Sequence, residues 1–343
     1  MIDIISIIII LLVTSGVVFI IRRFFAFYRL QKELKATFSK KVSPAVMKNM
    51  LKEPKIDFLD SRELDITILF SDIRGFTTIS ETIANPDCVI SLLNHYFTPM
   101  VDSIISKDGT VDKFIGDAIM AFWNAPTPHQ YHPDEAVSSA LQQVEALDEI
   151  NNWLKLQDQT LYNQILEAIN QDIADPKARY FQAINIGVGI NSGVAMIGEI
   201  GSSGKADYTA IGDSVNLASR LEGLCKVYGV AIIISEQTKN RLTKDFKLRE
   251  LDRVRVKGKN KDLRIYEVLH FNIDDWELKC YYKALNLYRK GRFQNAYLYF
   301  RKLTQKGTKE SYRLYKMYQQ RCAKFKLNPP KNWDGIFIFK RKY

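Results

Sequence analysis

Two short apolar segments of this chain each lead to an aspartate with a glycine close by, and this pattern constrains the fold more than any other feature. Asp72 follows the segment 64–70 in Phe70-Ser-Asp-Ile-Arg-Gly-Phe-Thr77, and Asp117 lies in Lys113-Phe-Ile-Gly-Asp117. Such segments predict strands, and glycine lets backbone approach a phosphate closely. Two carboxylates at strand ends can hold a pair of divalent metals ~3.5–4 Å apart, which suits phosphoryl chemistry.

Periodic segments along the middle of the chain predict an α+β fold. Residues 109–122 are typical of a hairpin with its turn at Gly116-Asp117. The other predicted strands are 64–70, 184–190, 230–234, 253–256 and 263–269, and the predicted helices are 86–106, 134–170 (with an insertion near 150–180) and 214–226. Strand, helix, hairpin, helix and strand in this order form the ferredoxin-like plan, here with additions.

The N-terminal segment is apolar enough to predict a membrane anchor. Residues 4–21 are nearly all apolar and roughly span a bilayer core of ~30 Å as a helix. Arg22 and Arg23 follow at once, which places that side in the cytoplasm. A cleaved signal peptide is the alternative, but no positive region precedes the apolar run. Residues 1–21 are therefore predicted as a transmembrane helix and 22–56 as a helical juxtamembrane connector.

Charge is spread unevenly and favours a membrane surface over nucleic acid. The net charge is about +8 over residues 22–56, about −9 over 57–272 and about +13 over 273–343. No helix-turn-helix, finger or RNA-binding signature accompanies the basic ends, so no nucleic acid is expected. The four cysteines lie far apart and contain no CxxC, which is typical of reduced thiols in a cytosolic environment.

Residues 273–343 are rich in Tyr, Lys and Arg and predict a helical tail. Gly291-Arg-Phe-Gln-Asn-Ala296, followed by Phe300, is similar to the second helix of a tetratricopeptide unit. One unit and a further helix over 309–325 are fewer than such arrays need, and an ordinary helical hairpin is the alternative. We expect this tail to pack on the preceding domain or on a protein partner.

Four motifs in one order identify a family resemblance over residues 57–272. They are the two aspartate motifs, Gly187-Val-Gly-Ile-Asn-Ser-Gly193, and Tyr208-Thr-Ala-Ile-Gly-Asp-Ser-Val-Asn-Leu-Ala-Ser-Arg-Leu-Glu222. The chain resembles the class III nucleotide cyclases, specifically bacterial membrane-anchored adenylate cyclases of the lysine/threonine subgroup. The resemblance implies a ferredoxin-like catalytic domain that makes 3′,5′-cyclic AMP and pyrophosphate from ATP.

The resemblance also implies which residues bind metal and phosphate. Asp72 and Asp117 would hold two Mg²⁺ ions, for which Mn²⁺ is a substitute. Mg²⁺ prefers a few carboxylates together with phosphate oxygens. The backbone of Ile73, Gly75, Phe76 and Thr77 would cradle the phosphates, and Lys257 would contact the terminal phosphates.

Base recognition and transition-state stabilisation fall on four further residues by the same resemblance. Lys113 and Thr209 match a pair that recognises adenine. Asn216 and Arg220 lie four apart on one predicted helix, hence on one face, and would orient the ribose and stabilise the pentavalent phosphorus. Some relatives have an arginine where this chain has Val194.

The sequence therefore predicts an adenylate cyclase of the inner membrane, with a single span and its catalytic domain in the cytoplasm. Six family positions, the two aspartates and the four base- and transition-state residues, are all filled in one chain, which implies a homodimer with two equivalent sites. A guanylate cyclase is the nearest alternative, and Lys113 disfavours it. A diguanylate cyclase is disfavoured because this chain lacks the Gly-Gly-Asp-Glu-Phe signature. A catalytically inactive membrane-anchored scaffold is the alternative of another class.

Overall fold

The structure is a computed structural model that describes residue 16 and residues 19–25, 27–29, 61–202, 205–255 and 262–339. The chain divides into two compact units, residues 1–54 and 55–343. In the first unit, residues 19–25 and 27–29 are helical. Among the described residues, no helix combines the length and apolar character needed to cross a membrane. Most of the predicted anchor 1–21 and connector 22–56 lies outside the described residues.

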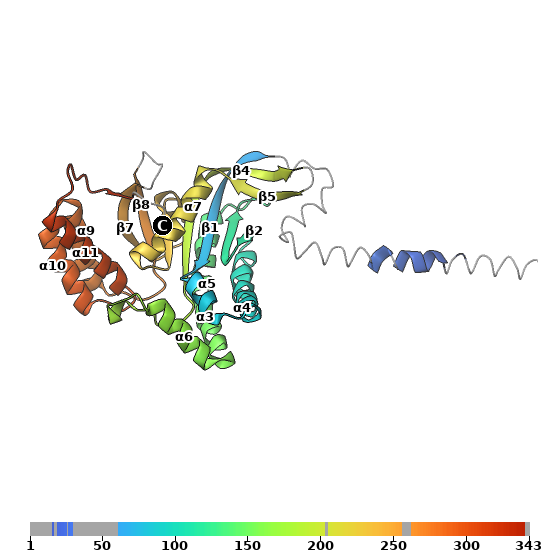
Figure 1. Ribbon diagram of the computed structural model, residues 1–343. Coiled ribbons are helices and arrows are strands. Elements are labelled where there is room, and N and C mark those ends of the chain that lie inside the picture. The colour runs from blue at the N-terminus through green and yellow to red at the C-terminus, as the bar shows by residue number, and fades with distance from the viewer. Residues whose placement is uncertain are drawn as a thin grey trace, which may run out of the picture. The chain divides into compact units, whose positions relative to one another are not determined.

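A mixed sheet is the framework of the second unit (Figure 1). Its strands are β1 (Arg62–Ile73), β2 (Thr110–Ile115), β3 (Ala118–Trp123), β4 (Ile186–Ser202), β5 (Lys205–Ile211), β6 (Ile232–Ser235), β7 (Leu248–Arg255), β8 (Leu263–Val268) and β9 (Phe337–Ile338). They follow the order β2-β3-β1-β4-β6-β8-β7-β9, and β5 pairs with β4 off this path. The β4–β6 and β7–β9 pairs are parallel, and the other pairs are antiparallel.

The helices connect these strands as the ferredoxin-like plan predicts. They are α3 (Phe76–Ile83), α4 (Pro86–Ile105), α5 (His132–Gln157), α6 (Gln159–Asn170), α7 (Asp213–Tyr228), α8 (Glu236–Lys239), α9 (Asp275–Arg289), α10 (Phe293–Lys306) and α11 (Tyr312–Leu327). The first four strands of the plan lie in the order β2-β3-β1-β4, with a strand, two helices, a hairpin, two helices and a strand along the chain. This arrangement confirms the ferredoxin-like order of strands and helices that the sequence predicts.

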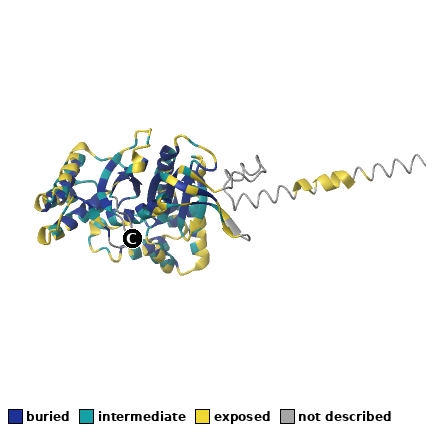
Figure 2. Ribbon diagram, turned by 90° about the horizontal axis from the view of Figure 1, so that it is seen from above, coloured by how far each residue is buried: buried dark blue, intermediate teal, exposed yellow. Residues whose placement is uncertain are grey.

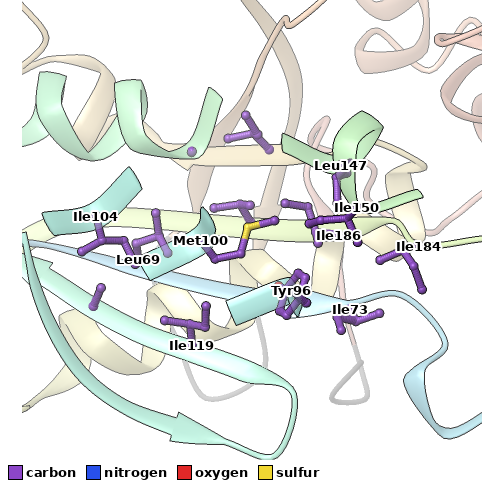
Figure 3. Packing of buried hydrophobic residues seen from close by; sticks show 14 of the residues in the cluster. Leu69, Ile73, Tyr96, Met100, Ile104, Ile119, Leu147, Ile150, Ile184 and Ile186 are labelled. Carbon is purple, nitrogen blue, oxygen red and sulfur yellow. The ribbon is translucent and has the colours of Figure 1, made fainter. Parts of the chain in front are cut away.

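The alternation of side chains along β1 builds two cores, one on each face of the sheet. Leu69 and Ile73 join Tyr96 and Met100 of α4 and residues of α5 in one core (Figure 3). Ile66 and Ile68 point to the other face, where Ala218 of α7 covers them. Asp72 has the same parity as Ile66 and Ile68, so it emerges on the face that carries α7.

A further core joins the tail to the sheet. Residues of α7, β7 and β8 pack in one cluster with Tyr281 of α9, Phe300 of α10 and Tyr318 of α11. Buried residues accordingly continue from the strands into the tail helices (Figure 2). Helices α9 and α10 form the predicted helical hairpin, and its assignment as a tetratricopeptide unit stays a prediction.

The sequence placed most elements correctly but misjudged the region around β4. The predicted strand 184–190 is the first part of a much longer β4, which folds back on β5 as an antiparallel ribbon. The predicted helical stretch 134–170 is two helices, broken where the Asp158 side chain accepts a hydrogen bond from Leu161 N at the start of α6. An aspartate in that position is a typical N-cap, so the break had a signal in the sequence.

Candidate active site

The two aspartates meet where β1 ends and the β2–β3 hairpin turns. Ser71 of β1 pairs with Ile119 of β3, so Asp117 in the turn comes level with the end of β1. Ile73 N donates a hydrogen bond to Asp117 Oδ2 at 3.2 Å. Hydrogen bonding between β1 and the hairpin thus holds both carboxyls at one edge, as the sequence predicts.

Asp72 is in an unfavourable environment for a negative charge when no cation is present. Burial, a hydrogen bond to the Asp117 side chain and the negative charges of Asp117 and Glu222 raise the pKa of Asp72 to about 8, against the opposing effect of Arg74. Asp72 Oδ1 is buried and has no hydrogen-bond partner in the protein. Crowded carboxylates with an unsatisfied buried oxygen fit a bound divalent cation, which would satisfy that oxygen and offset the repulsion.

Backbone amides follow Asp72 at the start of α3. Gly75 has a φ of 70°, which favours glycine, and this turn of the backbone begins α3 at Phe76. The first amides of a helix have no intrahelical acceptors and favour phosphate groups. Ile73 N is engaged by Asp117, so Phe76 and Thr77 supply the better-placed amides. The predicted phosphate-binding role of Ile73, Gly75, Phe76 and Thr77 remains a prediction.

A partly buried ion pair connects this turn to α7. Arg74 Nη1 lies 2.9 Å from Glu222 Oε1, and Arg74 Nη2 donates to Glu222 O at 3.1 Å. The guanidinium passes directly over Gly187 of β4, where a Cβ atom would lie 1.3 Å from Arg74 Nη2. Glycine at this position of the third motif leaves room for the guanidinium, and a side chain there would have to displace Arg74 from Glu222.

Lys113 of β2 and Thr209 of β5 come close together although their strands do not pair, and the Asp112 carboxylate contacts both. Lys113 Nζ lies 3.3 Å from Asp112 Oδ1 and 3.7 Å from Asp207 Oδ2. Thr209 Oγ1 donates to Asp112 Oδ2 at 2.5 Å. The predicted base-recognition pair is thus one cluster in the folded chain, although its members are far apart in sequence.

Helix α7 presents the two predicted transition-state residues, and its other face packs on the sheet. Asn216 is exposed, whereas its neighbours Val215 and Leu217 are buried. Arg220 follows one turn later and is partly buried. Val194 of β4 is 55% exposed, and its carbonyl accepts a hydrogen bond from Ser214 Oγ. Lys257 lies outside the described residues.

An apolar stripe borders the Lys113–Thr209 cluster. Met196 of β4 pairs directly with Ile211 of β5, and Val194 lies two residues away on the same face. All three are exposed, and Thr209 shares the parity of Ile211. Phe114 and Ile115 of β2 are exposed as well. This surface is apolar enough to suit a protein interface.

Two cavities of the described chain lie away from the paired aspartates. One of about 1090 Å³ lies beside α6, and one of about 390 Å³ is lined by Arg74, Tyr180, His270 and Arg313. Neither is lined by Asp72 or Lys113.

Three interactions were not predicted from the sequence. They are the contact of Asp112 with Thr209, the pairing of Arg74 with Glu222, and the buried ion pair of Arg249 with Glu267. Asp112 had a signal, because aspartate is unfavourable within a strand and directly precedes Lys113. The pairing of Arg74 with Glu222 had none, since it joins two motifs 148 residues apart.

Comparison with known proteins agrees with this geometry. Residues 60–270 match the family model of the adenylate and guanylate cyclase catalytic domain. The chain belongs to this cyclase family. The match covers more than half of the 343 residues and confirms the resemblance inferred from the four motifs.

Individual relatives of the cyclase are longer proteins. It is 37% identical over 206 residues to an adenylate cyclase of Anabaena cylindrica, covering 59% of this chain and 36% of that protein. It is 34% identical over 266 residues to the terminal-differentiation specific adenylate cyclase of Dictyostelium discoideum, covering 75% of this chain and 11% of that protein. The chain therefore spans roughly a tenth to a third of these relatives.

A solved structure has the same fold over the catalytic region. The adenylyl cyclase CyaB from P. aeruginosa is similar with a TM-score of 0.52 and 28% sequence identity. The alignment covers 62% of this chain and 98% of that one. The tail helices α9 to α11 lie beyond residues 60–270 of the family match.

Proposed function

We propose that this cyclase converts ATP to 3′,5′-cyclic AMP and pyrophosphate. The observation that carries the proposal is the meeting of Asp72 and Asp117 at one edge of the sheet, with Asp72 Oδ1 buried and unsatisfied. The relatives named adenylate cyclase support the choice of reaction. Lys113 and Thr209 support the choice of nucleotide.

Asp72 and Asp117 are the residues that would hold two Mg²⁺ ions. When bound, these ions would activate the ribose 3′-hydroxyl and neutralise the charge of the triphosphate. The amides of Phe76 and Thr77 would bind phosphate oxygens at the start of α3. Mn²⁺ is expected to replace Mg²⁺.

The remaining roles fall to the β2–β5 cluster and to α7. Lys113 would donate to the adenine ring and Thr209 would contact its exocyclic amine. Asn216 would orient the ribose, and Arg220 would stabilise the charge on the phosphorus, since a guanidinium offers several donors in one plane. Lys257 is proposed to contact the terminal phosphates.

We propose that the active site is shared by two chains. The apolar stripe of Val194, Met196 and Ile211 lies beside Thr209, and neither cavity within one chain is lined by the aspartates. A twofold homodimer buries such a stripe once on each partner and generates two equal sites. The tail is also proposed to accept a protein partner.

Residues 1–21 are proposed to anchor the cyclase in the inner membrane with the catalytic domain in the cytoplasm. The apolar sequence of residues 4–21 and the arginines that follow support this proposal. The full chain should then resist carbonate extraction of membranes, because a spanning helix inserts far more firmly than a basic patch. Release of the intact chain by high salt alone would contradict the anchor.

The experiment that tests the function is direct. Purified cyclase is incubated with ATP or GTP and Mg²⁺, and the cyclic nucleotide is quantified. Asp72→Ala or Asp117→Ala should lower turnover by at least ~10³-fold, because each removes a metal ligand. Asp65→Ala is the matched control, since Asp65 lies on the same strand, exposed, and pairs with Arg241. Preferred cyclisation of GTP would replace the proposal with a guanylate cyclase, and no cyclisation of either would favour a scaffold.

A further inference from the structure

Asp112 is the extra residue of a bulge in β2, and its side chain is fully buried. The register between β2 and β3 advances by two residues on β2 and one on β3 between Val111 and Lys113. Bulges re-aim side chains within a sheet. Here the Asp112 carboxylate has 0% exposure and faces Thr209 of β5.

Three donor groups lie close to this carboxylate. Thr209 Oγ1 donates to Asp112 Oδ2 at 2.5 Å, and Ala210 N donates to the same oxygen at 3.4 Å. Lys113 Nζ lies 3.3 Å from Asp112 Oδ1. Burial raises the pKa of Asp112, and the bond from Thr209 and the Lys113 charge oppose that shift.

We propose that Asp112 is a positioning residue that fixes the hydrogen-bond direction of Thr209 and so makes the site select a 6-aminopurine nucleotide. This inference rests on the proposed function of the site. A threonine hydroxyl has one proton and two acceptor lone pairs. Because that proton is committed to Asp112, Thr209 can only accept a hydrogen bond from a ligand. Lys113, in contrast, can only donate.

The donor and acceptor of this cluster match one kind of purine edge. Adenine offers an acceptor at N1 and a donor at its 6-amino group, whereas guanine offers a donor at N1 and an acceptor at O6. With Lys113 opposite N1 and Thr209 opposite position 6, adenine pairs at both atoms. Guanine would place a donor against the ammonium and an acceptor against the Thr209 lone pairs. A site that pairs polar groups in this way discriminates strongly against a ligand that leaves them unpaired.

Asp112→Asn tests the proposal while keeping the shape of the side chain. Its amide can donate to Thr209 Oγ1, which frees the hydroxyl proton to face the base. We expect the ratio of kcat/KM for ATP over GTP to fall by at least ~10-fold. The ratio for ATP over the triphosphate of purine riboside, which lacks the 6-amino group, should fall toward one.

A double-mutant cycle of Asp112 and Thr209 distinguishes a positioning role of Asp112 from general damage to the site. Thr209→Val should lower the same ratios, and Asp112→Asn combined with Thr209→Val should lower them no further, because both changes remove one interaction. Asp134→Asn is the matched control, since the buried Asp134 also accepts from a threonine hydroxyl, that of Thr243 at 2.7 Å. It should leave both ratios unchanged. Asp112→Ala also frees the hydroxyl, and it replaces Asp112→Asn if that variant does not fold.

The outcomes distinguish this inference from the proposed function. A folded Asp112 variant that keeps both ratios, while Thr209→Val changes them, would overturn the role of Asp112 and leave the cyclase activity standing. If wild type cyclises neither nucleotide, calorimetric binding of ATP, GTP and the purine riboside triphosphate decides instead. A binding preference for ATP that Asp112→Asn removes would support the inference although the proposed function had failed, and equal binding by both proteins would refute it.

Discussion

Binding of Mg²⁺ to the metal-free cyclase should release protons, because Asp72 must ionise to become a ligand. The pKa of Asp72 is raised to about 8, mainly by burial and by Asp117. At pH 7 a carboxyl with this pKa is about nine-tenths protonated, so binding should release about 0.9 proton per active site. The apparent affinity should fall about ninefold from pH 7 to pH 6.

Isothermal calorimetry measures this proton release when it is run in two buffers of different ionisation enthalpy. At pH 9 the release should drop to about 0.1 proton, because the carboxyl is then ionised beforehand. Asp72→Asn should abolish the release and weaken binding, whereas Asp65→Asn, an exposed aspartate of the same strand, should change neither. Binding of Mg²⁺ at pH 7 with almost no proton release would show that both carboxylates are already ionised, and the reasoning from burial would be wrong.

The same shift has a consequence for the stability of the metal-free protein. Between pH 4 and pH 8 the native Asp72 holds a proton that the unfolded chain has lost. Stability that depends on this group is therefore lost as the pH rises through this window. Mg²⁺ should offset this loss at pH 8. Adding Mg²⁺ at pH 8 should therefore raise the Tm of the wild-type protein more than it raises the Tm of the Asp72→Asn variant.

Three further predictions concern the shared site, the tail and acid stability. Asp72→Ala and Asn216→Ala chains should each be nearly inactive, and random mixing should restore roughly a quarter of wild-type activity when half the dimers are mixed; no recovery in crosslinked mixed dimers would contradict a shared site. Arg249→Met should lower the free energy of unfolding in urea by about 3–5 kcal/mol because it strands buried Glu267, and a second change, Glu267→Leu, should recover most of the loss. Burial lowers the pKa of His132 to about 4, so its neutral form stabilises the native state above pH 6.5 and this contribution is lost as the pH falls toward 4; His132→Gln should remove up to about 2 kcal/mol of the stability difference between pH 7 and pH 5.

Local patterns predicted the strands, the hairpin and the metal aspartates because each depends on neighbours in sequence. The turn at Gly116-Asp117 and the helix that begins at Pro86 after Asn85 both have chemistry that sequence alone reveals. The full length of β4 had no such signal. Its second half pairs only with β5, and the glycines at 198 and 201 weaken its strand pattern.

The sequence predicted the individual residues of the site, but it did not predict that they form two clusters, one around Asp72 and Asp117 and one around Asp112. Asp72 and Asp117 were expected together because each ends an apolar segment. The contact of Asp112 with Thr209 depends on a one-residue bulge and on the pairing of β4 with β5, which no local pattern specifies. The charged residues that join the tail to the sheet were likewise not predicted. Arg249 of β7 donates to Tyr315 of α11 at 3.0 Å, and Arg321 of α11 pairs with Asp252 of β7. Both arginines resemble ordinary surface residues until these partners are known.

The boundary of the family match is not a boundary of the folded body. The match ends at residue 270, yet Arg321 of α11 lies 2.7 Å from Asp252 of β7, and Tyr318 donates to the Leu251 carbonyl at 2.6 Å. A fragment trimmed to the matched region would leave Asp252 without its counter-ion and would uncover the apolar cluster that α7, β7 and β8 share with the tail helices. Loss of activity in such a fragment would report misfolding of the helix that carries Asn216 and Arg220, and it would be mistaken for evidence of a regulatory tail.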